Sequence, residues 1–560
     1  MRASLVTSLA VGCATALALP LSLTAPAAAA APGPRFAPAL APTAPTVPDA
    51  DVAGSTQSLP LEPLAPDGPR NRAGGGTTAG ERGLTRSEVR PFSLVGVVWD
   101  DAHAPLDGTV QVRSRSAADG TWSRWRDVET HNEEHGADPG TAEDRGAAPR
   151  GGTAPLWVGA SDGVEVRVRP EESERHERHD RHERHDRHER AGELPRGLRL
   201  ELVDPGREPE RAPRTRAMSA PADGGGGVAA PYTHYTGYPG YPGYTGQFTR
   251  PYPVGGPTSS GSGQAGQAGQ PGKSGKPGKP GHSGQSGKPG KPSRPGKQGQ
   301  SGPAGESEKA EQAVREATAA AESAGANAEL APYGVSSIPA QTHAQTVASL
   351  HKAPGAKPYI GARPKIVTRK GWGADEGLRE GGFSYTKTVK AAFVHHSATG
   401  NSYKCGEAAS VLRGIYRYHV KSMHWRDIGY NFAVDKCGTI YEGRAGGVAK
   451  AVQGAHTMGF NSDSMGIAVL GSYGSTNPPA AAVTAIARLT AWKLGLFEAN
   501  PKGKTTLTSG GGNRFKKGSK VKLNVISGHR DGFSTECPGK RLYGKLGTAR
   551  SASAKYQGRS

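Results

Sequence analysis

The stretch VKAAFVHHSAT, residues 389–399, sets two adjacent histidines at the end of a run of small and apolar side chains. Such a run predicts a buried β-strand, and His395 and His396 stand where it ends. A second run, VISG at 525–528, leads in the same way to His529. Polar side chains at strand ends are where functional sites collect, so these histidines are candidate site residues.

Strands and helices alternate around these two runs. Apolar spacing predicts helices over 407–423 and 479–497, a hairpin over 429–443 and a strand over 464–470. Elements mixed in this order are typical of an α/β layer. We therefore predict a domain over residues 364–550 in which helices flank a central mixed β-sheet.

Positive charge is concentrated in the same C-terminal third. Residues 365–559 hold 30 Lys and Arg against 11 Asp and Glu, which accounts for +19 of the net charge of +20. A field of this sign favours an anionic partner, which can be nucleic acid, a membrane surface or an anionic polymer such as a bacterial wall. The 81 Gly and 45 Pro, with only 34% hydrophobic residues, predict long linkers rather than one packed globule.

The first residues of the chain indicate a compartment. Arg2 precedes an apolar stretch and then the alanine run at 27–31, which is typical of a secretory signal peptide over residues 1–31. A short membrane anchor is the alternative for this segment. After it, no apolar run approaches the roughly 20 residues that a transmembrane helix needs. We therefore predict a secreted protein, extracellular or associated with the cell wall, that has no transmembrane segment and no nucleic-acid partner.

Shifts in composition divide the rest of the chain. Residues 88–204 alternate apolar and polar side chains between Asp-Gly turns, which predicts an antiparallel β-sandwich. A His/Arg/Glu-rich insertion at 171–192 is interpreted as a solvated loop, with loose metal binding as the alternative. The other predicted segments are a disordered leader at 32–87, a Gly/Pro/Tyr-rich linker at 205–262, a collagen-like G-x-y tract at 263–305, an Ala-rich helix at 306–324 and a linker at 325–363. The G-x-y tract is an extended spacer or, if it forms a triple helix, an element that makes a homotrimer.

The cysteines offer a second route to the site. Cys13 falls in the predicted signal peptide, and the remaining three predict one disulfide and one thiol with another role in an oxidising compartment. His395, His529 and Cys537 can form a zinc site, because a catalytic zinc keeps three nitrogen or sulfur ligands plus water. Spacing alone leaves the alternative that the histidines are simply hydrogen-bonded and the cysteine buried.

Seven short motifs follow one another within residues 364–550. They are RKGWGAD (369–375), VHHSAT (394–399), DIGYNF (427–432), GTIYEGR (438–444), GAHT (454–457), SMGIAVLG (464–471) and SGHRDGFSTECPG (527–539). Together they resemble the peptidoglycan recognition protein family, that is, the zinc-dependent type 2 N-acetylmuramoyl-L-alanine amidases. The resemblance covers about a third of the chain, and the preceding β-region is similar to the arrangement in actinobacterial members.

The resemblance implies roles for individual residues. It makes His395, His529 and Cys537 the zinc ligands and gives Tyr430 a contact with the zinc-bound water or the substrate carbonyl. Thr535 stands where the phage enzymes of this fold have a lysine, so it can donate a hydrogen bond but brings no charge.

The same resemblance implies the surroundings of the metal. It matches His456 to a groove residue that meets the muramyl-peptide and leaves His396 a secondary, substrate-binding role. Asn461, just downstream, is predicted to line the same groove, with a plain loop residue as the alternative. The resemblance also pairs Cys405 with Cys437 in a disulfide. The alternative for the pair is two free buried thiols.

These observations lead to one predicted function and two rivals. We predict a secreted zinc amidase that hydrolyses the amide bond between N-acetylmuramic acid and L-alanine in peptidoglycan, with anionic wall polymers as further partners of the basic segment 499–523. The first rival is a non-catalytic module that binds peptidoglycan. Cys537 argues against it, because non-catalytic family members typically lose this ligand. The second rival is a wall-associated structural protein trimerised by its collagen-like tract.

Overall fold

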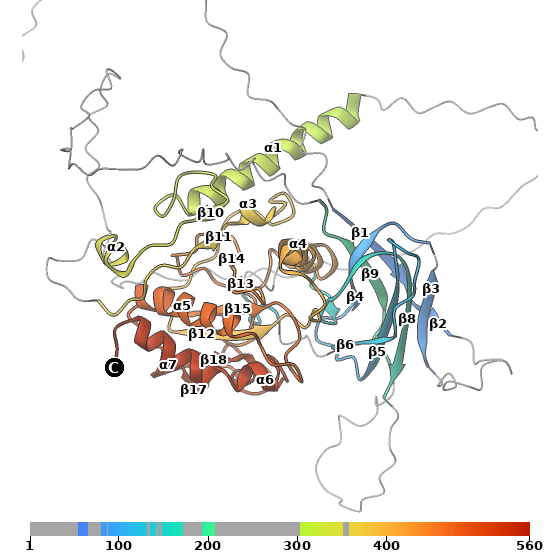
Figure 1. Cartoon of the computed structure of the whole chain (residues 1–560). Coiled ribbons are helices and arrows are strands. Elements are labelled where there is room, and N and C mark those ends of the chain that lie inside the picture. Colours follow the sequence, from blue (N-terminus) through green and yellow to red (C-terminus); the bar gives the residue numbers. More distant parts are fainter. Residues whose placement is uncertain are drawn as a thin grey trace, which may run out of the picture.

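The computed structural model describes residues 54–64, 80–86, 88–130, 135–141, 144, 148–171, 193–207, 303–350 and 358–560. The predicted signal peptide, His-rich insertion, linker beyond residue 207 and G-x-y tract up to residue 302 lie outside the described residues. In the part of the chain that is described, no helix is both long and apolar enough to cross a membrane. A β-rich N-terminal part and an α/β C-terminal part pack against each other (Figure 1).

The described N-terminal residues form one continuous antiparallel sheet (Figure 1). Its strands are β1 (Ser55–Pro60), β2 (Glu62–Pro63), β3 (Arg82–Arg86), β4 (Phe92–Trp99), β5 (Gly108–Ser116), β6 (Arg126–Val128), β7 (Gly151–Gly152), β8 (Leu156–Pro170) and β9 (Arg199–Asp204). The first half of β8 pairs with β4 and its second half pairs with β3 and β5, so the sheet folds over on itself. Val164, Val166 and Val168 alternate along β8 and are buried in the core, as the period-two pattern predicted.

The N-terminal sheet begins earlier in the chain than composition predicted. β1, β2 and β3 all fall within residues 32–87, which were expected to be a disordered leader. β1 pairs along its length with β9, β3 pairs with β8, and Leu61 and Leu84 are buried. These short strands hold too few apolar residues to give an alternating pattern. Pairing with strands far along the chain therefore decides their conformation.

A mixed sheet forms the centre of the C-terminal part, as predicted. In spatial order its strands are β10 (Ser337–Ile338), β11 (Ile366–Val367), β14 (Ile440–Glu442), β13 (Phe432–Val434), β15 (Ser464–Val469), β12 (Ala391–His396) and β18 (Ile526–Gly528). β12 runs parallel to both β15 and β18, whereas β14 is antiparallel to β13. The parallel trio at this end of the sheet carries the strand ends on which the predicted site depends.

Helices cover both faces of the C-terminal sheet (Figure 1). They are α3 (Arg369–Trp372), α4 (Ala408–Arg417), α5 (Ala480–Leu496), α6 (Lys540–Tyr543) and α7 (Leu546–Tyr556), with the short turns η2 (Cys405–Glu407), η3 (Tyr418–Ser422) and η4 (His529–Asp531). Ile486, Leu489 and Trp492 of α5 pack into the core on one face of the sheet, at the predicted helical spacing. α4 packs on the other face, between this sheet and β4 of the N-terminal part.

Two segments before residue 364 also belong to the C-terminal fold. α1 (Pro303–Ala326) contains the predicted Ala-rich helix, and α2 (His343–Ala348) follows it. β10 pairs with β11, and Ile338 and Ile360 are fully buried, so residues 325–350 and 358–363 contribute to the sheet and core where a linker was predicted over 325–363. The apolar residues of this segment are isolated in the sequence and form no periodic pattern. Their place in the core is therefore seen only in the folded structure.

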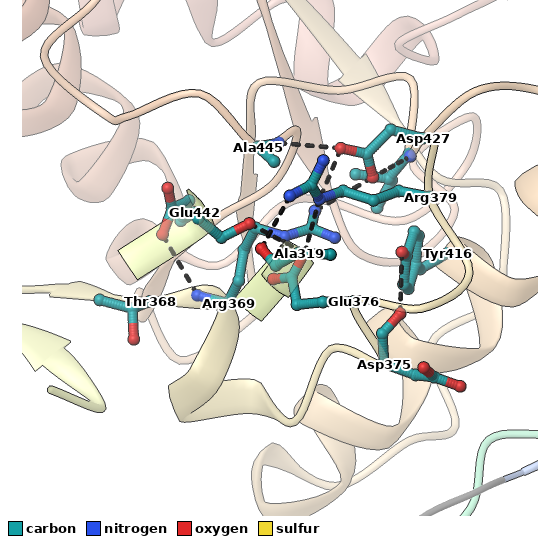
Figure 2. Close-up of polar contacts among 12 residues, drawn as sticks. Ala319, Thr368, Arg369, Asp375, Glu376, Arg379, Tyr416, Asp427, Glu442 and Ala445 are labelled. Carbon is teal, nitrogen blue, oxygen red and sulfur yellow. Dashed lines mark hydrogen bonds and ion pairs between the residues drawn. The ribbon is translucent and has the colours of Figure 1, made fainter. Parts of the chain in front are cut away.

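A buried network of ion pairs ties α1 and α3 to the loop before β13 (Figure 2). The Arg369 guanidinium, 1% exposed, donates to Glu376 at 2.7 Å and to Asp427 at 3.1 Å. Arg379 donates to the same Glu376 carboxylate at 2.8 Å and to the Ala319 carbonyl of α1 at 2.8 Å. Two guanidinium groups therefore balance two buried carboxylates, which is the condition for burying charge in a core.

Cys405 and Cys437 form a disulfide, as the resemblance implied. The bond joins the start of η2 to the turn between β13 and β14, across a sequence separation of 32 residues. Closing a loop of this length removes conformational entropy from the unfolded chain.

Replacing both cysteines of this disulfide by alanine is expected to lower the free energy of unfolding by about 3–4 kcal/mol, because the unfolded chain regains the entropy of the open loop. Denaturant unfolding of the full chain measures the change, and reduced wild-type protein is the matched control. A loss below about 1 kcal/mol in both samples would contradict this role for the disulfide.

Candidate metal centre

Two adjacent parallel strands bring the first two candidate ligands together. His395 lies near the end of β12, and His529 is the first residue of η4, directly after β18. Because β12 pairs in parallel with β18, the ends of both strands meet at one edge of the sheet. The two rings lie 4.4 Å apart between centroids, and each side chain is 0% exposed. Asp531 helps to hold this turn, because its carboxylate accepts a hydrogen bond from the Gly528 amide at 2.9 Å.

Cys537 completes the group that the sequence predicted. Its sulfur lies 3.8 Å from Nδ1 of His395, and the residue is 0% exposed. The Cys537 amide donates to the Thr535 hydroxyl at 3.1 Å, and the Cys537 carbonyl accepts from the Arg530 amide at 3.0 Å. Thr535 therefore braces the turn that carries the thiol.

A fourth side chain reaches the same place from the N-terminal part. His135 follows β6, and its ring centroid lies 4.5 Å from that of His529 and 5.2 Å from that of His395. One ligand atom from each of His135, His395, His529 and Cys537 can be chosen so that all four lie within 4.8 Å of one another. Sequence reasoning missed His135, whose only signal is a histidine beside acidic residues in the segment HNEEHGADPG at 131–140.

The electrostatics of this group suit a metal ion. Burial, together with the neighbouring imidazoles of His529 and His135, lowers the pKa of His395 well below its usual range. Burial also lowers the pKa of His135 to about 3. Both rings are therefore neutral near pH 7, and neutral imidazole is the form that binds a metal. Three imidazoles and one thiol fit zinc, whereas magnesium and calcium prefer oxygen ligands.

Tyr430 lies beside the four-residue group. Its ring centroid is 5.5 Å from that of His395 and 5.7 Å from that of His135. His419, a buried histidine that the sequence analysis did not single out, also contacts Tyr430. Its ring centroid lies 5.7 Å from that of Tyr430 and 4.4 Å from that of Trp425. The Gly429 amide donates to Nδ1 of His419 at 3.2 Å, which fixes the backbone next to Tyr430.

The three residues predicted to bind substrate occupy different positions. His456 is buried behind the group, with its ring 5.3 Å from that of His395. Asn461 is also buried, and its side-chain oxygen accepts hydrogen bonds from the amides of His456 and Thr457. His396 lies outside the four-residue group, and its Nε2 lies 3.3 Å from a carboxylate oxygen of Glu129 in the N-terminal part.

Known protein families resemble both parts of the chain. The family model described as N-acetylmuramoyl-L-alanine amidase matches residues 385–540, a span that contains His395, His529 and Cys537. The family model described as Rv3811 N-terminal galactose-binding domain-like matches residues 42–190. The N-terminal sheet is thus galactose-binding domain-like. The matched residues begin before residue 88, in agreement with the pairing of β1 with β9.

The similarity extends over most of the length of individual relatives. Peptidoglycan-recognition protein SC2 of Drosophila melanogaster is 32% identical over 185 residues, which are 33% of this chain and 85% of that protein. The peptidoglycan recognition protein of Trichoplusia ni is 29% identical over 182 residues, which are 32% and 85% of the two chains. Among solved structures, peptidoglycan recognition protein-LE in complex with tracheal cytotoxin is 29% identical, with a TM-score of 0.26 over 33% of this chain and 92% of that chain.

Proposed function

Because the chain belongs to the peptidoglycan recognition protein family of type 2 amidases, we propose that its C-terminal part is a zinc-dependent N-acetylmuramoyl-L-alanine amidase. Family membership supports peptidoglycan binding or amidase activity. The finer proposal is hydrolysis of the amide bond between N-acetylmuramic acid and L-alanine. The observation that carries it is the meeting of His395, His529 and Cys537 in one buried group at the end of β12.

In this proposal each residue at the site has a distinct task. His395, His529 and Cys537 would hold the zinc ion. When bound, zinc supplies a Lewis acid for the scissile carbonyl and lowers the pKa of water toward about 7. Tyr430 would donate its hydroxyl proton in a hydrogen bond to the carbonyl oxygen as negative charge develops there, a contribution of typically about 3 kcal/mol. Thr535 would position Cys537 through the amide hydrogen bond at 3.1 Å and would act as a second donor to that oxygen.

The residues around the metal would orient the muramyl-peptide. Asn461 holds the turn of His456 and Thr457 through its side-chain oxygen, so it would shape one wall of the groove. His456 would brace His395 from behind. His396 would contribute only where the N-terminal part leaves it accessible, because Glu129 faces it in the full chain.

A basic hairpin next to the sheet supports anionic wall polymers as further partners. β16 (Lys504–Thr508) and β17 (Lys520–Asn524) pair in an antiparallel ribbon whose apolar side is buried through Leu507, Val521 and Leu523. The cations of the ribbon and its flanks are all exposed to solvent: Lys502, Lys504, Arg514, Lys516, Lys517, Lys520 and Lys522. We propose that this face binds the anionic wall by charge.

The remaining organisation is also proposed from the sequence. Residues 1–31 would direct export, which places the protein outside the cell or at the cell wall. The G-x-y tract would act as a spacer between the two folded parts, with a homotrimer as the alternative.

The test uses the full chain and its His135→Ala variant, since a side chain of the N-terminal part lies in the metal-binding group. Each protein is loaded with zinc and incubated with a defined muramyl-pentapeptide. Mass spectrometry then detects free peptide that begins at L-alanine. Product that disappears with a chelator and returns with added zinc is expected. Substrate binding without product from either protein would overturn the amidase and favour the non-catalytic module.

A further inference from the structure

We propose that His135 is a fourth metal ligand, supplied by the N-terminal part, which closes the site and makes the full chain a latent enzyme. The inference rests on the proposed zinc site and extends it. A zinc ion that catalyses hydrolysis keeps three protein ligands and one open position, whereas a structural zinc ion has four protein ligands. Which of the two states this chain adopts depends on where residues 135–141 lie.

His135 lies nearly as close to the expected ligands as they lie to one another. Its ring lies 4.5 Å from that of His529, almost the same separation as the 4.4 Å between His395 and His529. It is 6% exposed, and the three expected ligands are each 0% exposed. Four nitrogen and sulfur donors within 4.8 Å match the number and type of protein ligands in a closed tetrahedral zinc site.

The segment that carries His135 is anchored to the C-terminal part by its own hydrogen bonds. The Asp138 carboxylate, with the residue 5% exposed, accepts from the Gly459 amide at 2.7 Å and from the Asn461 side-chain amide at 2.8 Å. That same Asn461 amide donates to the Gly136 carbonyl at 2.8 Å. Residues 135–141 therefore use Asn461, a residue predicted to bind substrate, as their own anchor. The segment and a muramyl-peptide would compete for this amide.

The N-terminal sheet docks firmly enough to deliver His135. The Tyr418 hydroxyl donates to the Thr153 carbonyl at 3.0 Å, and the Trp157 amide donates to the Thr399 carbonyl at 3.0 Å, three residues after His396. Leu94, Val98 and Val203 of the sheet share one core with Val411, Leu412 and Ile415 of α4. Because both parts belong to one chain, the imidazole acts at the high effective concentration of an intramolecular ligand.

The chemical consequence is that neither water nor the scissile carbonyl has a position on the metal while His135 is bound. Hydrolysis then requires the segment 135–141 to move away from His395, His529 and Cys537. A muramyl-peptide must displace one imidazole nitrogen and the hydrogen bonds of Asp138 before it reaches the metal. The N-terminal part would thus restrain the enzyme until a high local concentration of wall substrate competes with it.

The first experiment replaces zinc by cobalt in the full chain and follows the visible absorption of the cobalt ion. A closed site should give a spectrum that added azide does not change, because no ligand position is open. In His135→Ala, azide should bind and shift the bands. His343→Ala removes an exposed histidine on α2 and should behave as wild type. The affinity of His135→Ala for zinc should also fall. Loss of a side chain that only hydrogen-bonds to a metal ligand typically weakens metal binding by roughly 10–100-fold, and the loss here should be larger.

A second pair of variants loosens the segment without removing a ligand. Asp138→Ala loses the acceptor for Gly459 and Asn461, so its cobalt spectrum should respond to azide at concentrations that leave the wild type unchanged. Asp138→Asn keeps one carbonyl oxygen and should lie closer to wild type. Release of L-alanine peptide should rise at least about tenfold in His135→Ala, and this factor corresponds to about 1.4 kcal/mol. The rise in Asp138→Ala should be smaller.

The outcomes separate this inference from the proposed function. A thiolate-to-cobalt absorption band in the wild type, together with a wild-type response to azide equal to that of His135→Ala, would overturn the fourth ligand and leave the amidase intact. Absence of that band in every variant would overturn the metal site itself. Azide binding only after substitution of His135 or Asp138 supports the closed site.

Discussion

Replacing Cys537 by alanine in the His135→Ala chain is expected to reduce release of L-alanine peptide by about 1000-fold or more. The substitution removes a proposed metal ligand, and a bound metal ion supplies several kcal/mol of transition-state stabilisation, of which 4 kcal/mol corresponds to roughly that factor. Mass spectrometry of the released peptide measures the rate, and equilibrium dialysis measures the zinc content. Both quantities should fall together, because the thiol acts through the metal.

The control for this prediction addresses folding. The sulfur of Cys537 is buried, so the variant also loses packing. Thermal unfolding in the presence of a chelator compares the folds with the metal contribution removed. A variant that keeps more than about a tenth of the parent rate at low zinc would show that Cys537 is not a catalytic ligand.

Replacing Arg369 by methionine is expected to lower the free energy of unfolding by about 3–5 kcal/mol. Asp427 would lose its buried charge partner and Glu376 would keep only Arg379, and the cost of leaving a buried charge without its partner is of this size. Figure 2 shows why the effect spreads, since the same carboxylates also hold Arg379 and the backbone at Ala445. Urea unfolding of the full chain measures the loss.

Arg315→Met on α1 is the matched control. Its guanidinium lies 3.7 Å from Glu311, but both side chains are about 70% exposed, and such pairs contribute roughly 0–1 kcal/mol. Equal losses in the two variants would mean that burial of the Arg369 network adds nothing to stability. The Arg369 variant should also lower amidase activity, because Asp427 holds the Ile428 amide two residues before Tyr430.

The candidate metal site could be predicted in part because three of its four members follow local patterns. His395 and His529 each end an apolar strand run, and β12 and β18 are neighbours, so strand ends that are 134 residues apart in sequence meet. The motif around Cys537 supplied the third member by resemblance. Mixed-sheet architecture followed from the same alternation of strands and helices.

His135 could not be predicted because no local sequence pattern links it to His395, His529 or Cys537. It reaches His395 across 260 positions of sequence, from a segment that is neither strand nor helix. Only docking of the N-terminal sheet on α4 brings the two together, and that docking depends on both faces of β4 being apolar. Residues 325–363 illustrate the same limit, since Ile338 and Ile360 have no periodic neighbours yet enter the core.

The shared core of β4, β9 and α4 also determines what a break in the backbone would do. The two folded parts are joined covalently only through the segment between residues 207 and 303, but they hold each other through buried side chains and main-chain hydrogen bonds. A protease that nicks that segment would therefore produce two polypeptides that still migrate as one particle. Each piece on its own would expose an apolar surface to water. This surface would be formed by α4 in the C-terminal piece and by the outer side of β4 in the N-terminal piece. Limited digestion should thus change the bands on a denaturing gel long before it changes the size of the native molecule.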